Sequence, residues 1–375
     1  MRYLISGGGT GGHIFPAVSI AGALKQLDTE ADILFVGALG RMEMERVPEA
    51  GYKIVGLPVR GFNRQKPWKN ISVVWDMMRS MRMVKKVIRD FKPDAAVGVG
   101  GYASGAAMKV AARMGIPVLL QEQNGFAGVT NKLLKNDARK ICVAYEGMER
   151  FFPKDKILLT GNPVRQDLTS GDKERGVKYF NEHYPVHFTA DRPTLLVLGG
   201  SLGAQNMNRS VLAAFNTIVE SDIQVIWQTG KYYYDECIKG LEAEKNNNDV
   251  KEPNIICTPF LSNMPDCYAL ATVVASRAGA SSISEICLLG KPSILVPSPN
   301  VAEDHQTHNA MALVKKNAAV YIPDADADRS LIHKAVELIK APEKLKTLSD
   351  NALTLGKPDS AKQIAGEVIK LAKNK

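Results

Sequence analysis

A chain of 375 residues is too long for a single hydrophobic core and predicts two domains of ordinary size. Five cysteines, none of them in a CxxC pair, argue against a zinc site and indicate reduced thiols. The net charge of +9 is concentrated between residues 64 and 92, where nine Lys and Arg stand against two Asp. Because the rest is near neutral, we do not expect a nucleic-acid-binding protein.

Neither a signal peptide nor a membrane span is expected. The residues before the first run of glycines are too few for the apolar core of a signal peptide. No stretch approaches the roughly 18–20 apolar residues of a transmembrane helix. We therefore expect a protein that is cytosolic or bound at a membrane surface.

Short apolar runs alternate with helical patterns through the first half. The runs that predict buried strands are residues 3–6, 33–36, 95–99, 118–120 and 140–143. Residues 17–27 predict a helix, with Ile20, Leu24 and Leu27 on one face and Pro16 in its first turn. This alternation predicts a parallel sheet with helices on both faces.

The same pattern restarts after a polar stretch at residues 170–191. Strands are predicted at residues 194–198, 224–228, 255–258, 272–275 and 293–297. The fold class is therefore α/β, with two similar domains. We expect the first domain at residues 1–164, a linker at 165–192, the second domain at 193–356 and a C-terminal helix within 357–375 that packs back on the first domain.

Three glycine turns follow predicted strands, at residues 7–13, 98–102 and 198–204. Glycine lets the backbone turn tightly and lets a phosphate or sugar approach its amides, and a following helix N-terminus favours an anion. One such turn can be purely structural, but three in two similar domains predict ligand sites at the carboxyl ends of the strands. The first turn is a poor dinucleotide site, because Gly37 and Ala38 stand where an acid is needed.

His13 directly follows the first glycine turn, where a helix is expected to begin. A helix N-terminus disfavours the imidazolium form, and a neutral ring can accept a proton from a sugar hydroxyl. The alternative is a histidine that only caps or packs.

Residues 272–291 form the candidate diphosphate site of the second half. Small and hydroxyl residues at 280–284 offer amides and hydroxyls to a diphosphate, and Glu285 can accept both hydroxyls of a ribose. The alternative is a capped helix in which Ser282 and Glu285 form a capping box. Further on, Gln306 or Asn309 is a candidate for contacts with sugar hydroxyls, unless this segment is only a solvated helix start.

The acidic run at residues 324–328 resembles the DxD motif that holds a metal in some nucleotide-sugar enzymes. It follows Pro323 and precedes a predicted helix at residues 329–339. We therefore explain Asp326 or Asp328 as a helix N-cap and expect no metal site there.

Residues 66–92 predict a helix with two unlike faces. The residues predicted to face the core are Val74, Met77, Met81, Val84, Ile88 and Phe91. The residues predicted to lie elsewhere are Trp75, Met78, Arg79, Arg82, Lys86 and Arg89. Exposed Trp and Met beside basic side chains suit an anionic membrane surface. The alternative is a solvated face with a half-buried Trp.

Motifs from the N-terminus to about Asn309 closely resemble those of the MurG family of glycosyltransferases. They are Gly8-Gly9-Thr10-Gly11-Gly12-His13 with Phe15-Pro16, Gly100-Gly101-Tyr102-Ala103-Ser104, Glu122-Gln123-Asn124, Gly161-Asn162-Pro163-Val164-Arg165, Gly199-Gly200-Ser201-Leu202-Gly203-Ala204 and Ser284-Glu285. The chain departs from the family pattern at Gln121, where the family often has His, at Leu202, where Gln is commoner, and at Ala278, which replaces a common Ser.

The resemblance implies a GT-B fold, with two Rossmann-like parallel-sheet domains facing across a cleft. It implies transfer of N-acetylglucosamine from UDP-GlcNAc, with inversion, to the 4-hydroxyl of the MurNAc-pentapeptide of undecaprenyl-linked lipid I. The product would be lipid II for peptidoglycan, and so for cell shape and division. No cofactor or metal is implied in the donor site. The implied location is peripheral, on the anionic cytoplasmic face of the inner membrane, in company with other cell-wall synthesis enzymes.

The resemblance also implies the site residues. The donor contacts are Thr10, Gly11, Gly12, Asn124, Arg165, Ser201, Leu261 (through its backbone, to uracil), Ala280, Ser281, Ser282, Ile283, Ser284, Glu285 and Gln306. The acceptor loop is Gly100, Gly101 and Tyr102, and the general base is His13 or, as second choice, Glu122. The alternatives are another GT-B enzyme, such as a glycolipid glycosyltransferase or a UDP-GlcNAc 2-epimerase, a non-catalytic nucleotide-sugar-binding protein, and a nicotinamide oxidoreductase.

Overall fold

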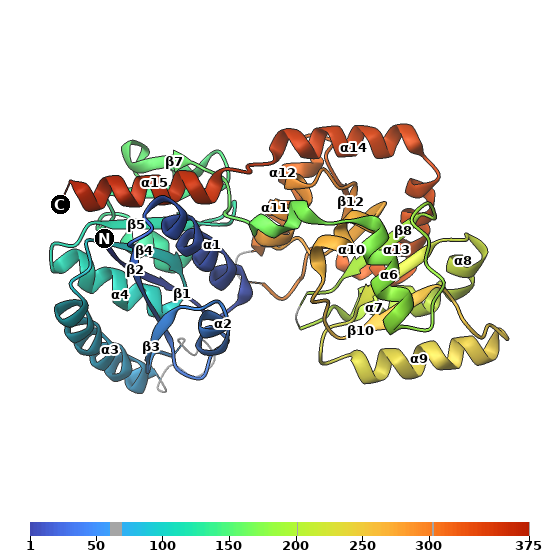
Figure 1. Cartoon of the computed structure of the whole chain (residues 1–375), viewed down its shortest axis with the longest axis horizontal. Coiled ribbons are helices and arrows are strands. Elements are labelled where there is room, and N and C mark those ends of the chain that lie inside the picture. The colour runs from blue at the N-terminus through green and yellow to red at the C-terminus, as the bar shows by residue number, and fades with distance from the viewer. Residues whose placement is uncertain (61–69, 201, 302–303, 375) are drawn as a thin grey trace. The chain divides into compact units, whose positions relative to one another are not determined.

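Contacts divide the chain, studied as a computed structural model, into two compact units, each of which is described by itself (Figure 1). Unit 1 comprises Met1–Arg165 and Lys357–Lys375, and unit 2 comprises Gln166–Gly356. The structure describes residues 1–60, 70–200, 202–301 and 304–374.

The described residues of unit 1 form a seven-stranded sheet in the order β3-β2-β1-β4-β5-β6-β7, with every neighbouring pair parallel. The strands are β1 (Arg2–Gly7), β2 (Asp32–Ala38), β3 (Lys53–Leu57), β4 (Ala95–Gly100), β5 (Val118–Glu122), β6 (Lys140–Val143) and β7 (Ile157–Leu159). The strand order reverses between β1 and β4, where Gly7 pairs with Gly100. Ligands of such sheets bind at this reversal, and the first two glycine turns meet there.

Helices cover both faces of this sheet. They are α1 (Gly11–Leu27), α2 (Glu43–Glu49), α3 (Asn70–Phe91), α4 (Tyr102–Arg113), α5 (Val129–Leu134) and α15 (Ser360–Lys373). Alternate residues of β1 enter different cores, since Ile5 packs with α1 and α15 and Leu4 packs with α3 and α4. The C-terminal α15 lies on α1 through side chains such as Ile364 and Val368, and Ser360 Oγ donates to Thr160 O at 2.6 Å.

Helix α1 corrects two details of the sequence prediction. It begins at Gly11, so Pro16 lies inside it rather than in its first turn. Leu27, its last residue, is exposed and does not share the buried face of Ile20 and Leu24. The start at Gly11 places His13 within the first turn of the helix.

The described residues of unit 2 form a six-stranded parallel sheet in the order β10-β9-β8-β11-β12-β13. The strands are β8 (Thr194–Leu198), β9 (Gln224–Gln228), β10 (Ile255–Thr258), β11 (Val273–Ser276), β12 (Ser293–Leu295) and β13 (Val320–Tyr321). The helices are α6 (Lys173–His183), α7 (Gln205–Ala213), α8 (Phe215–Glu220), α9 (Tyr234–Asn247), α10 (Met264–Leu270), α11 (Ala280–Leu288), α12 (His305–Val314), α13 (Asp324–Ile339) and α14 (Pro342–Leu355). The two-domain α/β prediction is confirmed, and the order again reverses, between β8 and β11.

The stretch expected as a linker, residues 165–192, is largely part of unit 2. It contains α6, whose first turn is capped by Asp172 accepting from Arg175 N at 2.7 Å. Phe180 of α6 is fully buried, and Arg175 forms an ion pair with the buried Asp266 of α10. The linker prediction was wrong here because a cap and one buried aromatic residue specify this mostly polar helix.

Three features of the structure concern its cysteines, possible membrane-spanning helices and possible metal-ligand clusters. All five cysteines are buried free thiols, as expected. Within residues 1–60, 70–200, 202–301 and 304–374, no helix is long and apolar enough to cross a membrane, and no three metal-ligating side chains cluster.

Candidate active site

The first glycine turn joins the end of β1 at Gly7 to the start of α1 at Gly11. Gly9 has φ +90°, a conformation that favours glycine, and Thr10 is the extended N-cap residue with no side-chain capping bond. His13 N and Ile14 N both donate to Thr10 O. The amides of Gly11 and Gly12 lie in the first turn, where a helix offers N–H groups to anions or hydroxyls.

His13 is half-buried, and one of its ring nitrogens contacts the glycine turn. Its Nδ1 lies 3.0 Å from Gly8 O. A carbonyl oxygen can only accept, so Nδ1 carries the hydrogen, and in the neutral ring Nε2 is the acceptor nitrogen. This is the tautomer that a base acting through Nε2 requires.

The second glycine turn lies against the first. A Cβ built on Gly100 would lie 2.8 Å from His13 Nε2, and a Cβ on Gly101 would lie 2.5 Å from Gly8 O. Both residues have positive φ, so glycine is needed for conformation and for space. The exposed Tyr102 begins α4 directly after this turn. The structure thus brings the predicted acceptor loop beside the predicted base.

Glu122 has surroundings that do not suit a general base. Its side chain is almost completely buried, and its Oε1 accepts from Asn124 N at 3.1 Å. Its Oε2 accepts from Gly128 N and from Asn131 Nδ2, both at 2.9 Å. A carboxylate engaged by these donors holds the loop after β5 in shape, so Glu122 fits a positioning role and His13 is the better candidate for the base.

In unit 2 the predicted diphosphate site lies at the turn from β11 into the N-terminus of α11. Gly279 is the extended N-cap residue and α11 begins at Ala280. The Oγ of Ser281 is buried and has no hydrogen-bond partner among the described residues. Ser284 Oγ donates to Ala280 O at 2.8 Å, which commits this hydroxyl to the helix. The helix N-terminus and the Ser281 hydroxyl are therefore the groups best placed for an anion.

Two predictions for this segment need correction. Ser282 lies inside α11 and Gly279 is the N-cap residue, so the capping box of Ser282 with Glu285 is not formed. Ile283 packs in the core, and its N–H donates to Gly279 O, so it supplies no side-chain contact. Glu285 accepts a 2.9 Å hydrogen bond from the hydroxyl of the buried Tyr268, a partner that the sequence did not reveal.

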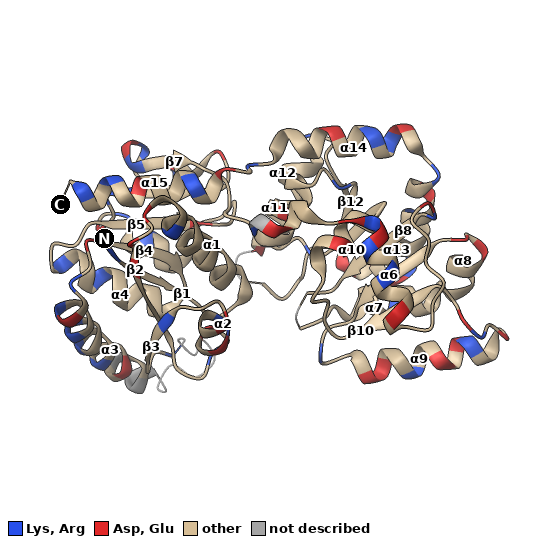
Figure 2. Ribbon diagram, viewed as in Figure 1, with Lys and Arg blue, Asp and Glu red and all other residues tan. Residues whose placement is uncertain are grey.

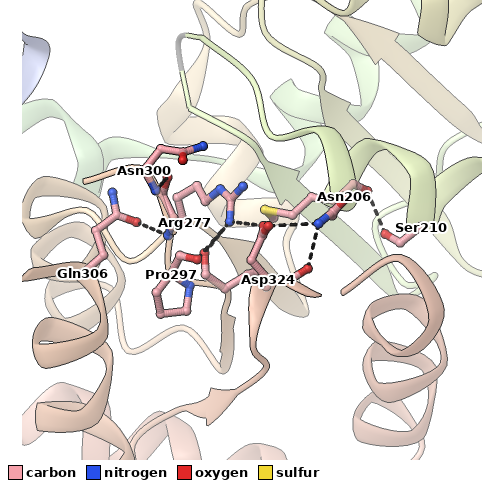
Figure 3. Close-up of polar contacts among 10 residues, drawn as sticks. Asn206, Ser210, Arg277, Pro297, Asn300, Gln306 and Asp324 are labelled. Atoms are coloured by element: carbon pink, nitrogen blue, oxygen red, sulfur yellow. Dashed lines mark hydrogen bonds and ion pairs between the residues drawn. The ribbon is translucent and has the colours of Figure 1, made fainter. Parts of the chain in front are cut away.

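A polar network lies at the carboxyl ends of β11 and β12 (Figure 3). Arg277 Nη1 donates to Val296 O and Pro297 O, both at 3.1 Å, and forms an ion pair with Asp324. Gln306 Oε1 accepts from Ser298 N at 2.8 Å. The amide nitrogen of Gln306 is then the group that can donate to a sugar hydroxyl.

The same network corrects the prediction for the acidic run at residues 324–328. Helix α13 begins at Asp324, so neither Asp326 nor Asp328 is its N-cap. The Asp324 carboxylate binds Arg277 and accepts from Asn206 Nδ2 at 2.9 Å (Figure 3). Arg277 was assigned no role from the sequence. A single Arg directly after a buried strand could have indicated a polar network at the end of that strand.

Four further predicted residues are Leu261, Asn309, Arg165 and Ser201. Leu261 is buried and its N–H donates to Gln228 Oε1 at 3.0 Å, which leaves its carbonyl oxygen for the predicted uracil contact. Asn309 is buried and its Nδ2 donates to Ala278 O at 3.3 Å, so it holds the turn rather than a sugar. Arg165 is half-buried at the end of unit 1, and Ser201 lies outside the described residues.

Helix α3 presents the predicted basic face. Trp75 is 63% exposed rather than half-buried, and Met78 is exposed too. The basic side chains Arg79, Arg82, Lys85, Lys86 and Arg89 are all exposed. Lys and Arg, drawn in blue, recur along α3 in Figure 2. Val84 and Ile88 of the same helix are buried.

Comparisons with known proteins show the family of the chain. Residues 3–143 match the glycosyltransferase family 28 N-terminal domain, and residues 194–364 match the C-terminal domain of that family. A Bacteroides thetaiotaomicron protein named UDP-N-acetylglucosamine–N-acetylmuramyl-(pentapeptide) pyrophosphoryl-undecaprenol N-acetylglucosamine transferase is 55% identical, over 99% of this chain and 98% of that protein. The chain belongs to the MurG family.

Solved structures support the fold of this MurG family member. MurG of Acinetobacter baumannii matches with a TM-score of 0.76 at 24% identity, over 98% of this chain and 99% of that one. The UDP-GlcNAc 2-epimerase of Neisseria meningitidis matches with a TM-score of 0.67 at 16% identity, over all of both chains. At these identities the likeness shows the GT-B fold alone.

One departure from the MurG pattern has a structural explanation. Gln121, where the family often has His, is fully buried, and its Nε2 donates to Asn162 Oδ1 at 3.0 Å. Its own Oε1 accepts from Gln123 Nε2, and Asn162 Nδ2 donates to Gln123 O. The amide of Gln121 therefore ties the end of β5 to the Gly161–Arg165 motif without a ring nitrogen.

Proposed function

We propose that this chain transfers N-acetylglucosamine from UDP-GlcNAc to the 4-hydroxyl of the MurNAc-pentapeptide of lipid I, forming lipid II. The observation that carries the proposal is 55% identity, over nearly the whole length, to a transferase whose name states this reaction. The two glycine turns beside His13 in unit 1 and the helix N-terminus of α11 in unit 2 supply matching chemistry.

Unit 2 is the proposed donor side. The diphosphate lies at the N-terminus of α11, near the backbone amide of Ala280 and the hydroxyl of Ser281. The ribose hydroxyls bind Glu285, and the amide nitrogen of Gln306 donates to the sugar. Thr10, Gly11, Gly12, Asn124, Arg165 and Ser201 remain predicted donor contacts.

The reaction is a single displacement. The acceptor 4-oxygen attacks the anomeric carbon, the bond to the UDP oxygen breaks, and its electron pair leaves with UDP, which inverts the configuration. The acceptor proton passes to His13 Nε2. The helix N-terminus stabilises the negative charge that grows on the diphosphate, so we expect no metal requirement.

Unit 1 is the proposed acceptor and membrane side. The Gly100–Gly101–Tyr102 turn lies next to His13 and receives the acceptor. The exposed Trp75, Met78 and basic residues of α3 bind an anionic bilayer, the cytoplasmic face of the inner membrane, where the undecaprenyl chain is anchored. Other cell-wall synthesis enzymes are expected partners at that surface.

The test of the activity uses UDP-GlcNAc with a lipid I analogue that carries a shortened prenyl chain. We expect a β-1,4-linked disaccharide product and release of one UDP per transfer, with full activity in the presence of EDTA. A parallel incubation with donor alone should give no epimerised sugar. An epimer without any disaccharide would replace this proposal with the 2-epimerase alternative.

A further inference from the structure

Glu43, the first residue of α2, is an acidic side chain that the proposed mechanism leaves without a role. It is 0% exposed. Its Oε2 accepts from Gly9 N at 2.9 Å and its Oε1 accepts from Ala38 N at 3.0 Å. Burying a carboxylate is unfavourable unless N–H groups satisfy it, so these two backbone donors fix its position.

Two glycines make room for this carboxylate. A Cβ on Gly8 would collide with Glu43 Oε1, and a Cβ on Gly37 would lie 2.6 Å from Glu43 Cγ. Gly37 and Ala38 end β2, where a dinucleotide-binding protein would carry its ribose-binding acid. In this chain an acid reaches the same sheet edge from α2 instead, and it binds the glycine turn.

The hydrogen bonds of Glu43 and His13 share one peptide group. The N–H of Gly9 donates to Glu43, and the carbonyl of Gly8, in the same peptide unit, accepts from His13 Nδ1 at 3.0 Å. Carboxylate, peptide and imidazole therefore form a continuous chain of hydrogen bonds. Each bond in such a chain polarises the next, so the carboxylate makes Gly8 O a stronger acceptor.

We propose that Glu43 is a positioning residue that acts through the Gly8–Gly9 peptide to hold His13 in its Nδ1–H tautomer. The inference rests on the proposed role of His13 as base. In the Ser-His-Asp triad a carboxylate orients the imidazole directly. Here a peptide group lies between them, and the outcome is the same, with Nε2 as the nitrogen that accepts a proton.

The test is Glu43→Gln in the full chain. A Gln side chain has one acceptor oxygen and one NH₂ group, so it cannot accept from both Gly9 N and Ala38 N. Nitrogen-15 NMR of the histidine rings, with the His13 signals assigned through His13→Gln, should show a larger Nε2–H population for His13. The kcat for transfer should fall about 10- to 100-fold, as for other residues that orient a functional histidine. The KM for UDP-GlcNAc should rise by a smaller factor than kcat falls, because most of the proposed donor contacts, including Ala280–Glu285 and Gln306, belong to unit 2 and Glu43 belongs to unit 1.

Glu45→Gln is the matched control, since Glu45 is exposed on the same helix and the charge change is the same. Glu43→Asp keeps the charge but is one methylene shorter, so it should give intermediate tautomer populations and kcat. Wild-type tautomer and kcat in both Glu43 variants would overturn the inference. A tautomer change in Glu43→Gln, combined with full transfer activity of His13→Ala, would support the peptide link and overturn the proposed role of His13.

Discussion

Tyr268 donates its hydroxyl hydrogen to Glu285, the carboxylate that we propose for the ribose. Tyr268→Phe removes that donor and leaves the buried ring in place. Loss of one such hydrogen bond is worth about 1 kcal/mol, so the KM for UDP-GlcNAc should rise about fivefold. Because the ribose is held equally before and during transfer, kcat should change little.

Initial-rate kinetics measure this change, with Tyr232→Phe as the control because Tyr232 is 76% exposed in the same unit. An unchanged donor KM in Tyr268→Phe would show that Glu285 does not depend on Tyr268.

The positions of single residues were predicted from the sequence better than their partners. The glycine turns placed His13 and Gly101 correctly because a positive φ and a following helix are local properties. The donors that engage Glu122 come from residues as far along the chain as Asn131, and Asp324 lies 47 residues from Arg277. Such pairs depend on tertiary packing, which no local pattern records.

At the scale of elements, the contact of α6 with α10 depends on one buried carboxylate. Asp266 is shielded from solvent, and burial by itself would raise its pKa. Hydrogen bonds from Arg175, Asp172 N and Asn263 outweigh that effect and lower the pKa of Asp266 below its usual 3.8. The stabilising contribution is therefore present above about pH 4 and is lost as the pH falls through the lowered value.

Asp266→Asn should lower the free energy of unfolding by about 2–4 kcal/mol at pH 7, since buried donors lose a charged acceptor. Urea unfolding at several pH values measures this, with Glu174→Gln, an exposed change on α6, as the control. The difference in free energy of unfolding between wild type and Asp266→Asn should become smaller below pH 4. A difference that stays constant from pH 7 to pH 3 would contradict the stabilising role of the ionised Asp266.

Helix α3 is the element expected to meet the membrane. Each basic residue near an anionic bilayer contributes about 1 kcal/mol, so changing Arg82, Lys86 and Arg89 together to Gln should weaken binding about 100-fold. Co-sedimentation with vesicles containing anionic lipid measures the effect. The control changes the exposed Lys239, Lys251 and Lys316 of unit 2 to Gln. An equal loss of vesicle binding in both triple variants would indicate that binding depends on the net charge of the protein and not on α3.

Elements were predicted well where burial is continuous. Strands such as Thr194–Leu198 and Lys140–Val143 were found at their observed bounds, because each is a short, mostly apolar run that is buried along nearly all of its length. The missed strands β3, β7 and β13 lie at sheet edges, and the last two have only three and two residues. Helix α6 was missed because its apolar residues are few.

Across the whole molecule, the thiols report on the integrity of both units. Burial is the main cause that raises the pKa of Cys142 and of Cys237, Cys257, Cys267 and Cys287 to about 12. Thiolate is the reactive form, so none should react with a disulfide reagent at pH 8 within minutes. All five should react after denaturation in guanidinium. Rapid labelling of the native protein would show that one of the units opens.

The central claim is that His13 takes the acceptor proton, and the most direct measurement is kcat for transfer by His13→Ala. We predict a loss of about 10²- to 10⁴-fold, the usual contribution of a general base. The rise in melting temperature caused by UDP should be largely retained, because the proposed nucleotide contacts Leu261 and Ala280–Glu285 belong to unit 2 and do not include His13. The exposed His333→Ala is the control. Transfer by His13→Ala within about threefold of wild type would contradict the claim.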